Sequence, residues 1–487
     1  MTIRPGPALA VLLLLGLGTW VYLKEFRGAE ERQKAEAAKD MPLRFERADL
    51  QAIAIQNSSG TLRLERSGDV WSITAPLASP ADRDAIEGVL TSLETGRIER
   101  RLGEVPEKKT YGLDPPGASL TLETSAGAPQ VIGLGDASPI GGSVYALLPG
   151  GQEVAVVSSS LSEVAKKDLL GLRDKSLLTF DPWKIKSLTI ERGKETVALL
   201  KPDEGWKIER PIEAPADGPT ITDFLSALER VRAGRFVAEK AADSDRKTYG
   251  LDPPAARVTL LQEGWDTSKT VLLGKEEAGT RYAETAGRDP IVTVGSDIWP
   301  KVTTSLFDLR RKDLLAVSQY RTTALTAALD GGEALVLAKQ QDGAWSASGL
   351  AKGAVKADTI DALLRAISEL KAVAFDDQPS ETLRSSLARQ PTLDLTLEQE
   401  ADTEGGTPRR QHLIAGTPMK DGRMQVRDMA WSPIALVDGG VLAKIKEQIE
   451  AVVKETSETA AAPATPETPP ADPGTAAGSA PPDGPPD

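Results

Sequence analysis

The sequence repeats itself at an interval of about one small domain. The string KTYGLDPP begins at Lys109 and again at Lys247. GLRDKSLL at Gly171 is matched, at nearly the same interval, by DLRRKDLL at Asp308. Landmarks that recur in the same order at nearly the same interval indicate a duplicated unit. An interval as long as this one indicates an array of whole domains rather than a solenoid of short repeats.

A third, diverged copy follows the first two. Trp71, Trp206 and Trp345 each end a hairpin-like stretch, and their spacing matches that of the other landmarks. The third copy has SSLARQP over residues 385–391, so it keeps the proline of YGLDPP but lacks the tyrosine, glycine and aspartate. We therefore expect three tandem repeats after the amino-terminal region: 43–176, 177–315 and 316–453.

The apolar pattern predicts the same elements in each repeat. In repeat 1, alternation predicts a strand over 50–55 that turns at 57–60. Asp82 has the position of a helix N-cap before an apolar stripe. That stripe consists of Ile86, Val89, Leu90 and Leu93, and later strands are expected at 119–123, 131–134, 144–148 and 154–157. One closing helix is expected to carry Leu161, Ala165, Leu169 and Leu172. The predicted class is α+β, a mainly antiparallel sheet with one inserted and one connecting helix.

The composition excludes several chemistries. The chain has no cysteine and one histidine, His412, which rules out cysteine-ligated metals, cysteine nucleophiles and multi-histidine sites. Its net charge of −13 argues against nucleic acid as a partner, because phosphate binding needs a basic face. We predict no catalytic, cofactor-binding or metal-binding residue.

Residues 7–23 form an uncharged apolar run. As a helix the run would extend roughly 26 Å, close to the thickness of a bilayer core. A cleaved signal peptide is the alternative, but large residues occupy 20–23, where cleavage needs small ones. We therefore predict an uncleaved transmembrane anchor.

The orientation of this anchor follows from conflicting signals. Counting Lys and Arg would place the carboxyl-terminal side in the cytoplasm. The very short tail at 1–6 instead favours a signal anchor that exports the long domain after it. We expect a cytoplasmic tail at 1–6, a charged stalk at 24–42, and a single-pass inner-membrane protein whose bulk is periplasmic.

The carboxyl-terminal segment 454–487 has a different composition from the repeats. From Thr456 onward the chain contains nine prolines, eight alanines, five acids and no base. Such a segment cannot bury a core, so it is predicted to be a disordered acidic tail.

The repeated YGLDPP string has two interpretations. It could place Tyr111, Asp114, Tyr249 and Asp252 in a binding site. It could also be a turn, in which glycine adopts a positive φ, aspartate caps the turn through its side chain, and proline fixes the chain before the next strand. We favour the turn, because duplicated units reuse a turn that folding requires.

Two other candidates are weak on sequence alone. His412 has no second histidine or cysteine to share a metal, so a surface or edge-strand position is favoured. Asp376 and Asp377 could supply the carboxylate pair of a glycoside hydrolase. For these two aspartates a position on the solvated surface is the favoured interpretation.

The pattern resembles a family named only as domain of unknown function 4340. The amino-terminal apolar run, the tryptophan-ended hairpins, the repeated YGLDPP and the LRDKSLL and LRRKDLL strings carry the resemblance, over about 43–453. It implies a membrane-anchored bacterial envelope protein, often encoded beside ABC-transporter components of the gliding-motility type. No catalytic residues are established for that family.

The sequence and the resemblance together predict a non-enzymatic protein. We expect a membrane-anchored periplasmic scaffold or binding protein, with ABC transporter subunits or other envelope proteins as partners and no cofactor. Two alternatives stay open: a module that binds envelope polysaccharide or peptidoglycan, and a carboxylate-based hydrolase.

Overall fold

The computed structural model describes residues 40–461, except 126, 140, 203–204, 402–406 and 431–432. The predicted anchor, nearly all of the stalk and most of the predicted tail lie outside the described residues. The described chain forms two compact bodies. The N-terminal body contains the residues up to Leu177 together with Arg232–Phe236, and the C-terminal body contains Leu178–Val231 and the residues from Val237 onward.

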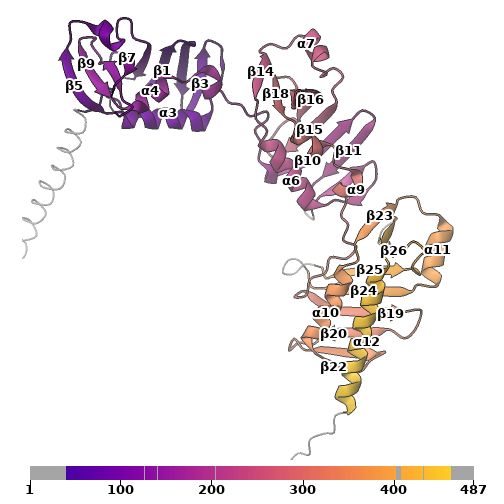
Figure 1. The fold of residues 1–487 in the computed structure, drawn as a ribbon. Coiled ribbons are helices and arrows are strands. Elements are labelled where there is room, and N and C mark those ends of the chain that lie inside the picture. Colours follow the sequence, from indigo (N-terminus) through magenta and orange to yellow (C-terminus); the bar gives the residue numbers. More distant parts are fainter. Residues whose placement is uncertain are drawn as a thin grey trace, which may run out of the picture. The chain divides into compact units, whose positions relative to one another are not determined.

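Each predicted repeat holds one nine-stranded sheet in the described part of the chain, and its neighbouring strands run antiparallel (Figure 1). The predicted α+β tandem arrangement is confirmed. The strands of repeat 1 are β1 (Leu50–Asn57), β2 (Gly60–Ser67), β3 (Val70–Ala75), β4 (Ser79–Pro80), β5 (Ile98–Glu104), β6 (Ala118–Thr124), β7 (Gln130–Ala137), β8 (Val144–Leu147) and β9 (Glu153–Val157). Its helices are α3 (Arg83–Thr95), the 3-10 turn η2 (Lys108–Tyr111), α4 (Ser159–Ala165) and α5 (Leu169–Leu172).

Repeats 2 and 3 have the same order of strands and the same crossing helix, and differ from repeat 1 in their short helices. Repeat 2 has the turn η3 (Pro182–Lys184), then β10 (Ile185–Arg192), β11 (Glu195–Leu200), β12 (Lys207–Arg210), β13 (Ala214–Pro215), α6 (Gly218–Glu229), β14 (Arg235–Ala238), α7 (Asp243–Thr248), β15 (Ala256–Gln262), β16 (Lys269–Glu277), β17 (Thr280–Thr285), β18 (Ile291–Gly295), α8 (Ile298–Val302) and α9 (Leu306–Leu309). Repeat 3 has β19 (Thr322–Leu329), β20 (Leu335–Lys339), β21 (Trp345–Gly349), β22 (Gly353–Val355), α10 (Ala357–Ser368), β23 (Ala372–Asp376), α11 (Glu381–Arg389), β24 (Leu393–Gln399), β25 (Arg409–Ala415), β26 (Arg423–Asp428), β27 (Ile434–Asp438) and α12 (Gly440–Ala461).

The strand order explains the inserted helix. In repeat 1 the order is β4-β3-β2-β1-β6-β7-β8-β9-β5, so two meanders meet at β1 and β6. After β4 the chain must travel from one edge of the sheet to β5 at the other edge. Helix α3 lies in this crossing connection and covers the sheet on the way. Repeats 2 and 3 have the equivalent order, with α6 and α10 in the same connection.

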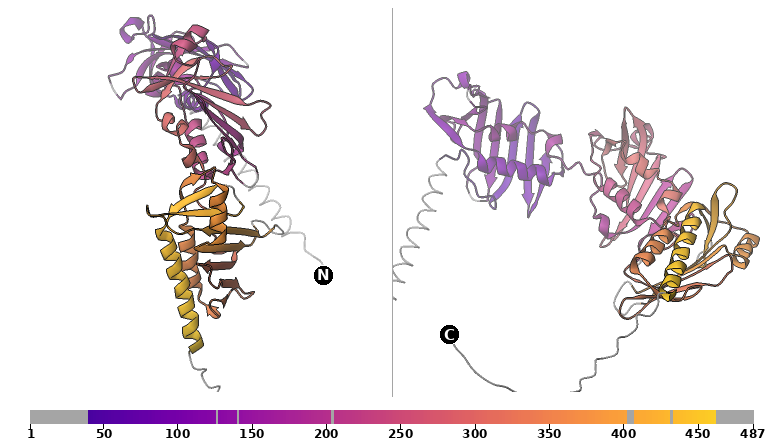
Figure 2. Two further views of the ribbon diagram at one scale, coloured as in Figure 1. Left: turned by 90° about the vertical axis from the view of Figure 1, so that its right-hand side faces the viewer. Right: turned by 60° about the horizontal axis from the view of Figure 1, so that its bottom comes forward.

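One face of each sheet packs against helices. In the register of the first sheet, Ile53 lies opposite both Leu64 and Leu122, and all three are fully buried. The predicted apolar stripe of α3 covers them, and its four residues are buried. The predicted N-cap is also confirmed, because the Asp82 carboxylate accepts a hydrogen bond from the Ala85 N–H at 2.8 Å. In repeat 3, α10 and α12 lie side by side on this face (Figures 1 and 2).

The single closing helix predicted for each repeat is wrong for repeats 1 and 2. Two short helices stand there instead, α4 and α5 in repeat 1 and α8 and α9 in repeat 2. Each second helix begins at an N-cap of its own. The Asp168 carboxylate accepts a hydrogen bond from the Gly171 N–H at 2.7 Å, and the Ser305 hydroxyl accepts one from the Asp308 N–H at 3.1 Å. In repeat 3 one helix, α12, continues to Ala461, beyond the boundary predicted at 453.

The opposite face of each sheet is only partly covered. In repeat 2 a second apolar cluster there joins Leu251 of the repeated motif to Leu272, Tyr282 and Ile291 of the sheet. In repeat 3, Leu387 of α11 does the same with Ile414 and Ile434. The segment between β5 and β6, and its equivalents, is therefore the cover of this half. On the other half Arg63 reaches across β1 to Glu123, with two contacts of 2.8 Å.

Repeat 3 caps its crossing helix in an unexpected way. Repeats 1 and 2 use Asp82 and Asp217, but the equivalent position in repeat 3 is Lys356, whose side chain makes no capping bond. Glu455 of α12 replaces the cap: it accepts the Lys356 N–H at 3.0 Å and the Thr359 hydroxyl at 2.6 Å. Burial alone would raise the pKa of Glu455, but these bonds and the charge of Lys356 outweigh it and hold the pKa below its ordinary value.

Replacing Glu455 by alanine should lower the free energy of unfolding by roughly 1–2 kcal/mol, because a helix cap is lost. Since the folded-state pKa is depressed, this stabilisation is present above the unfolded pKa of about 4.3 and is lost as the pH falls through the folded value. Urea unfolding of wild type and Glu455→Ala from pH 7 to pH 3 measures the difference.

The control is Glu450→Ala, an exposed glutamate on the same helix. Equal costs for the two variants at pH 7, or a difference that grows as the pH falls, would contradict the cap.

Candidate functional site: the motif-covered face and the joint between repeats

The YGLDPP motif is a turn in both copies, as predicted. Gly112 and Gly250 have φ values of 67° and 68°, in the left-handed region that favours glycine. Each ends a short helical turn, and its N–H donates to the carbonyl of Lys109 or Lys247 at 3.0 and 3.2 Å. The glycines of the motif are therefore required by the backbone.

A second glycine in each repeat makes this turn fit against the sheet. An added Cβ at Gly274 would lie 2.3 Å from the carbonyl oxygen of Tyr249, and one at Gly135 would lie 2.1 Å from that of Tyr111. The N–H of Lys275 donates to the same Tyr249 oxygen at 3.0 Å. Sequence reasoning missed this contact; the recurrence of the glycine one repeat later was its only signal.

The predicted role of the motif aspartates is not supported. The side chains of Asp114 and Asp252 make no hydrogen bond with any described residue, so they do not cap the turn. Each stands directly before a proline of the motif, Pro115 or Pro253. Among the described residues, neither aspartate belongs to a cluster of three or more metal-ligating side chains.

The motif tyrosines pack against the sheet. Tyr111 contacts Tyr145 of β8 with ring centroids 4.8 Å apart, and Tyr249 contacts Tyr282 of β17 at 4.4 Å. Aromatic pairs at such distances contribute packing energy beyond their buried area. Both tyrosines therefore hold the turn in place, which favours a structural role.

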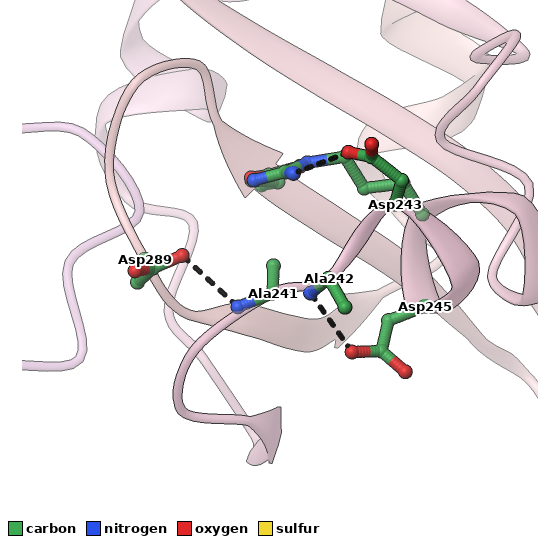
Figure 3. Close-up of polar contacts among 7 residues, drawn as sticks. Ala241, Ala242, Asp243, Asp245 and Asp289 are labelled. Carbon is green, nitrogen blue, oxygen red and sulfur yellow. Dashed lines mark hydrogen bonds and ion pairs between the residues drawn. The ribbon is translucent and has the colours of Figure 1, made fainter.

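In repeat 2 an ion pair also fixes the motif segment. Arg246 of α7 donates to Glu284 of β17, whose side chain is 1% exposed, with its shortest contact at 2.7 Å. Hydrogen bonding to Glu284 raises the pKa of the Arg246 guanidinium. Figure 3 shows the start of α7, where Asp289 accepts the Ala241 N–H at 3.0 Å and Asp245 accepts the Ala242 N–H at 2.9 Å. These acids are occupied in holding the chain.

Gly274→Ala should destabilise the C-terminal body by about 2–4 kcal/mol, because its Cβ would collide with the Tyr249 carbonyl and move the motif off the sheet. Gly218→Ala is the matched control, since a Cβ there meets nothing within 4 Å. Thermal unfolding of both variants measures the difference. A Gly274→Ala protein as stable as the control would show that the close approach does not matter.

The LRRKDLL string forms the joint between repeats 2 and 3. Arg310 is 2% exposed, and its guanidinium carbon lies 3.5 Å from the ring centroid of Phe375 on β23. Its Nη1 donates to Asp377 at 2.6 Å. An arginine from one repeat is thus buried against an aromatic ring and a carboxylate of the next, an arrangement stabilised by cation–π and charge-assisted hydrogen bonding.

Main-chain bonds accompany this arginine on both sides. The Asp217 N–H donates to the carbonyl of Leu309 at 2.8 Å, and the Arg311 N–H donates to the carbonyl of Pro215 at 3.0 Å. These two bonds attach the string to the start of α6. On the other side the Ala372 N–H donates to Lys312 at 2.8 Å, beside β23. The string therefore lies between the helix cap of its own repeat and the edge strand of the next.

The N-terminal body contains the same ring contact and the same kind of main-chain bonds. The guanidinium carbon of Arg173 lies 3.6 Å from the ring centroid of Phe236. The Asp82 N–H donates to Leu172 at 2.8 Å, and the Ala233 N–H donates to Lys175 at 2.7 Å. LRDKSLL and LRRKDLL thus make equivalent contacts, which explains why both strings are present.

Each of the remaining sequence candidates has a hydrogen-bond partner among the described residues. Asp377 is paired with Arg310, and Asp376 accepts the Gln378 N–H at 3.1 Å, so the two do not form a free carboxylate pair. His412 lies on β25, which has a neighbouring strand on each side, so the expected edge-strand position is wrong. Its Nε2 is 2.9 Å from an oxygen of Asp394. Within the described residues no group of three or more metal-ligating side chains converges.

The family model described as Domain of unknown function (DUF4340) matches the chain twice, over residues 71–210 and 206–388. The chain belongs to this family. Arg173 lies in the first matched range, and Arg310, Phe375 and Asp377 lie in the second. Each match of the family model therefore contains the arginine of one joint, and the resemblance expected from the sequence is confirmed.

The other comparisons add no relative. No curated protein and no solved structure matches the chain. Among the helices that the structure describes, none combines the length and the apolar character needed to cross a lipid bilayer.

Arg310→Ala should lower the free energy of unfolding of the C-terminal body by about 2–4 kcal/mol, since a buried charge, its partner contact and its ring contact are lost. Asp377→Asn should cost less, and the double variant should show coupling of roughly 1–3 kcal/mol. Chemical denaturation of the four proteins measures the cycle.

The control is Asp376→Asn, which should change stability by no more than about 0.5 kcal/mol. Additive effects of Arg310→Ala and Asp377→Asn would mean that the ion pair does not hold the joint.

Proposed function

We propose that the chain is a non-enzymatic, membrane-anchored periplasmic scaffold for other envelope proteins, serving an ABC-type transport system. The observation that carries this proposal is the arginine joint, present at Arg173 and again at Arg310. A catalytic protein needs one site, whereas a scaffold gains from joining several similar modules through the same contact.

The sheets provide surfaces suited to such a role. Half of one face in each repeat is left without a helical cover and carries polar side chains in ion pairs. Arg63 with Glu123 in repeat 1 and Arg257 with Glu191 in repeat 2 are examples. Mixed polar surfaces of this kind are typical of the rims of non-obligate protein contacts.

The amino-terminal apolar run supports membrane attachment, and the family resemblance supports the envelope and the transporter. The pairing of Asp377 with Arg310 weakens the hydrolase alternative at Asp376 and Asp377. Binding of envelope polysaccharide or peptidoglycan stays the alternative that an experiment must separate from scaffolding.

The test is affinity purification of the tagged full-length chain from detergent-solubilised membranes, after protease treatment of spheroplasts has established that residues 43–453 are exposed. We expect defined membrane proteins, transporter subunits among them, to be recovered with wild type and with Asp376→Asn. Recovery should fall with Arg310→Ala, which breaks the joint. Retained glycan without protein partners would favour the binding-module alternative, and protection of residues 43–453 would overturn the periplasmic location.

A further inference from the structure

A groove lies beside the joint between repeats 2 and 3, which both belong to the C-terminal body. Its cavity of about 710 Å³ is lined on one side by the end of β11, by β12 and by the segment that leads into β13. Asp377, Ala430 and Pro433 of repeat 3 line the other side. A volume of several hundred cubic ångström is typical of ligand-binding pockets. We call this cavity the joint groove.

The floor of the joint groove is apolar. Leu200 of β11 is 39% exposed, and Ile212 in the same lining is half-buried. In the sheet register Leu199 lies opposite Ile208, and both are buried. Because side chains alternate along a strand, Leu200 and its cross-strand partner Lys207 point to the opposite face. An apolar side chain of a ligand would lose its contact with water on this floor.

Three charged side chains surround this floor. Lys207, Glu209 and Glu213 are exposed, and none of them has a hydrogen bond or ion pair with any residue that the structure describes. Lys207 and Glu209 stand two residues apart on β12, so they point to the same face at a spacing of roughly 7 Å. Asp377, the remaining charged residue of the lining, is paired with Arg310. One positive and two negative charges are therefore available to a ligand.

The other repeats form the same sheet without these charges. The strand register gives the positions equivalent to 207 and 209, which are Ser72 and Thr74 in repeat 1 and Ser346 and Ser348 in repeat 3. Glu213 is matched by Ala78 in repeat 1 and by Lys352, with a charge of opposite sign, in repeat 3. The fold therefore does not require the three charges of repeat 2.

The spacing of the charges favours an extended peptide as the ligand. Side chains on one face of an extended peptide recur every two residues, at roughly the spacing of Lys207 and Glu209. A segment with charges of one sign only would be repelled either by Lys207 or by the two glutamates. The complementary segment therefore has an acidic and a basic residue two positions apart, with an apolar residue on the same face.

We propose that the joint groove binds an extended segment of a partner protein with this pattern. The apolar side chain packs on Leu200 and Ile212. The basic side chain pairs with Glu209 and Glu213, and the acidic one pairs with Lys207. Because repeat 3 supplies the other side of the groove, the segment binds only when the joint is formed. This assignment rests on the proposed scaffold function, for which the joint groove is a partner site.

The experiment selects ligands for the purified full-length chain, in detergent micelles, from a phage-displayed library of random dodecapeptides. We expect the enriched peptides to share the acidic, basic and apolar pattern. A synthetic enriched peptide, followed by fluorescence anisotropy, should bind about tenfold more weakly to Leu200→Asp and to the double variant Glu209→Lys, Glu213→Lys. The same peptide with its basic residue changed to glutamate should bind the double variant more tightly than wild type.

The matched controls are Leu350→Asp and the double variant Glu333→Lys, Glu447→Lys, which make the same changes at exposed residues of repeat 3 and should leave binding unchanged. Enriched peptides without the pattern, or equal weakening by the control variants, overturn the proposal. So does a reversed peptide that prefers wild type. The reversed peptide requires a gain of binding, which an unfolded variant could not give.

Affinity purification of the same variants separates this site from the scaffold function. Membrane proteins recovered with wild type should be lost with Glu209→Lys, Glu213→Lys and retained with Glu333→Lys, Glu447→Lys. Retention with both double variants would overturn the joint groove as the partner site and leave the scaffold intact. Recovery of no membrane protein with wild type would overturn the scaffold, and the peptide selection would still decide whether the groove binds.

Discussion

The C-terminal body depends on the burial of one positive charge. Arg310 is almost inaccessible to water, and taking a guanidinium out of water costs several kcal/mol unless an acceptor and a polarisable surface replace the solvent. Phe375 and Asp377 provide both, and they belong to the next repeat. The arginine is therefore stable only when the two repeats are joined. Because the same string continues from the helix cap of its own repeat, folding of the repeat and formation of the joint are coupled.

Close packing also explains the YGLDPP motif. A turn that packs on the free face of a sheet must bring its backbone close to a strand, and only glycine leaves room for the carbonyl of Tyr249 at Gly274. The tyrosine rings then fill the space beside the turn. Repeat 3 lacks the motif and uses α11 and Leu387 for the same cover. In each case half of the second face of the sheet is covered, by the YGLDPP turn in repeat 2 and by α11 in repeat 3.

Duplication also leaves the copies free to diverge. Trp206 and Trp345 are part of the buried interior, whereas Trp71 lines a groove with three arginines. Repeat 3 has no aspartate cap on its crossing helix and uses Glu455 from a longer last helix. Equivalent positions in the three repeats therefore differ in burial and in hydrogen bonding, while the sheet that they belong to is the same.

Short-range patterns in the sequence were enough to predict the local elements of the fold. Apolar periodicity predicted the strands around Ile53 and the stripe of α3, and an aspartate before that stripe predicted the cap at Asp82. The sequence could not predict that Arg310 pairs with Asp377, that Glu455 caps α10 or that Gly274 contacts the carbonyl of Tyr249. These contacts join residues far apart in the chain, and no periodic signal accompanies them. These contacts depend on the tertiary structure, because the strand order and the crossing helix determine which distant residues become neighbours.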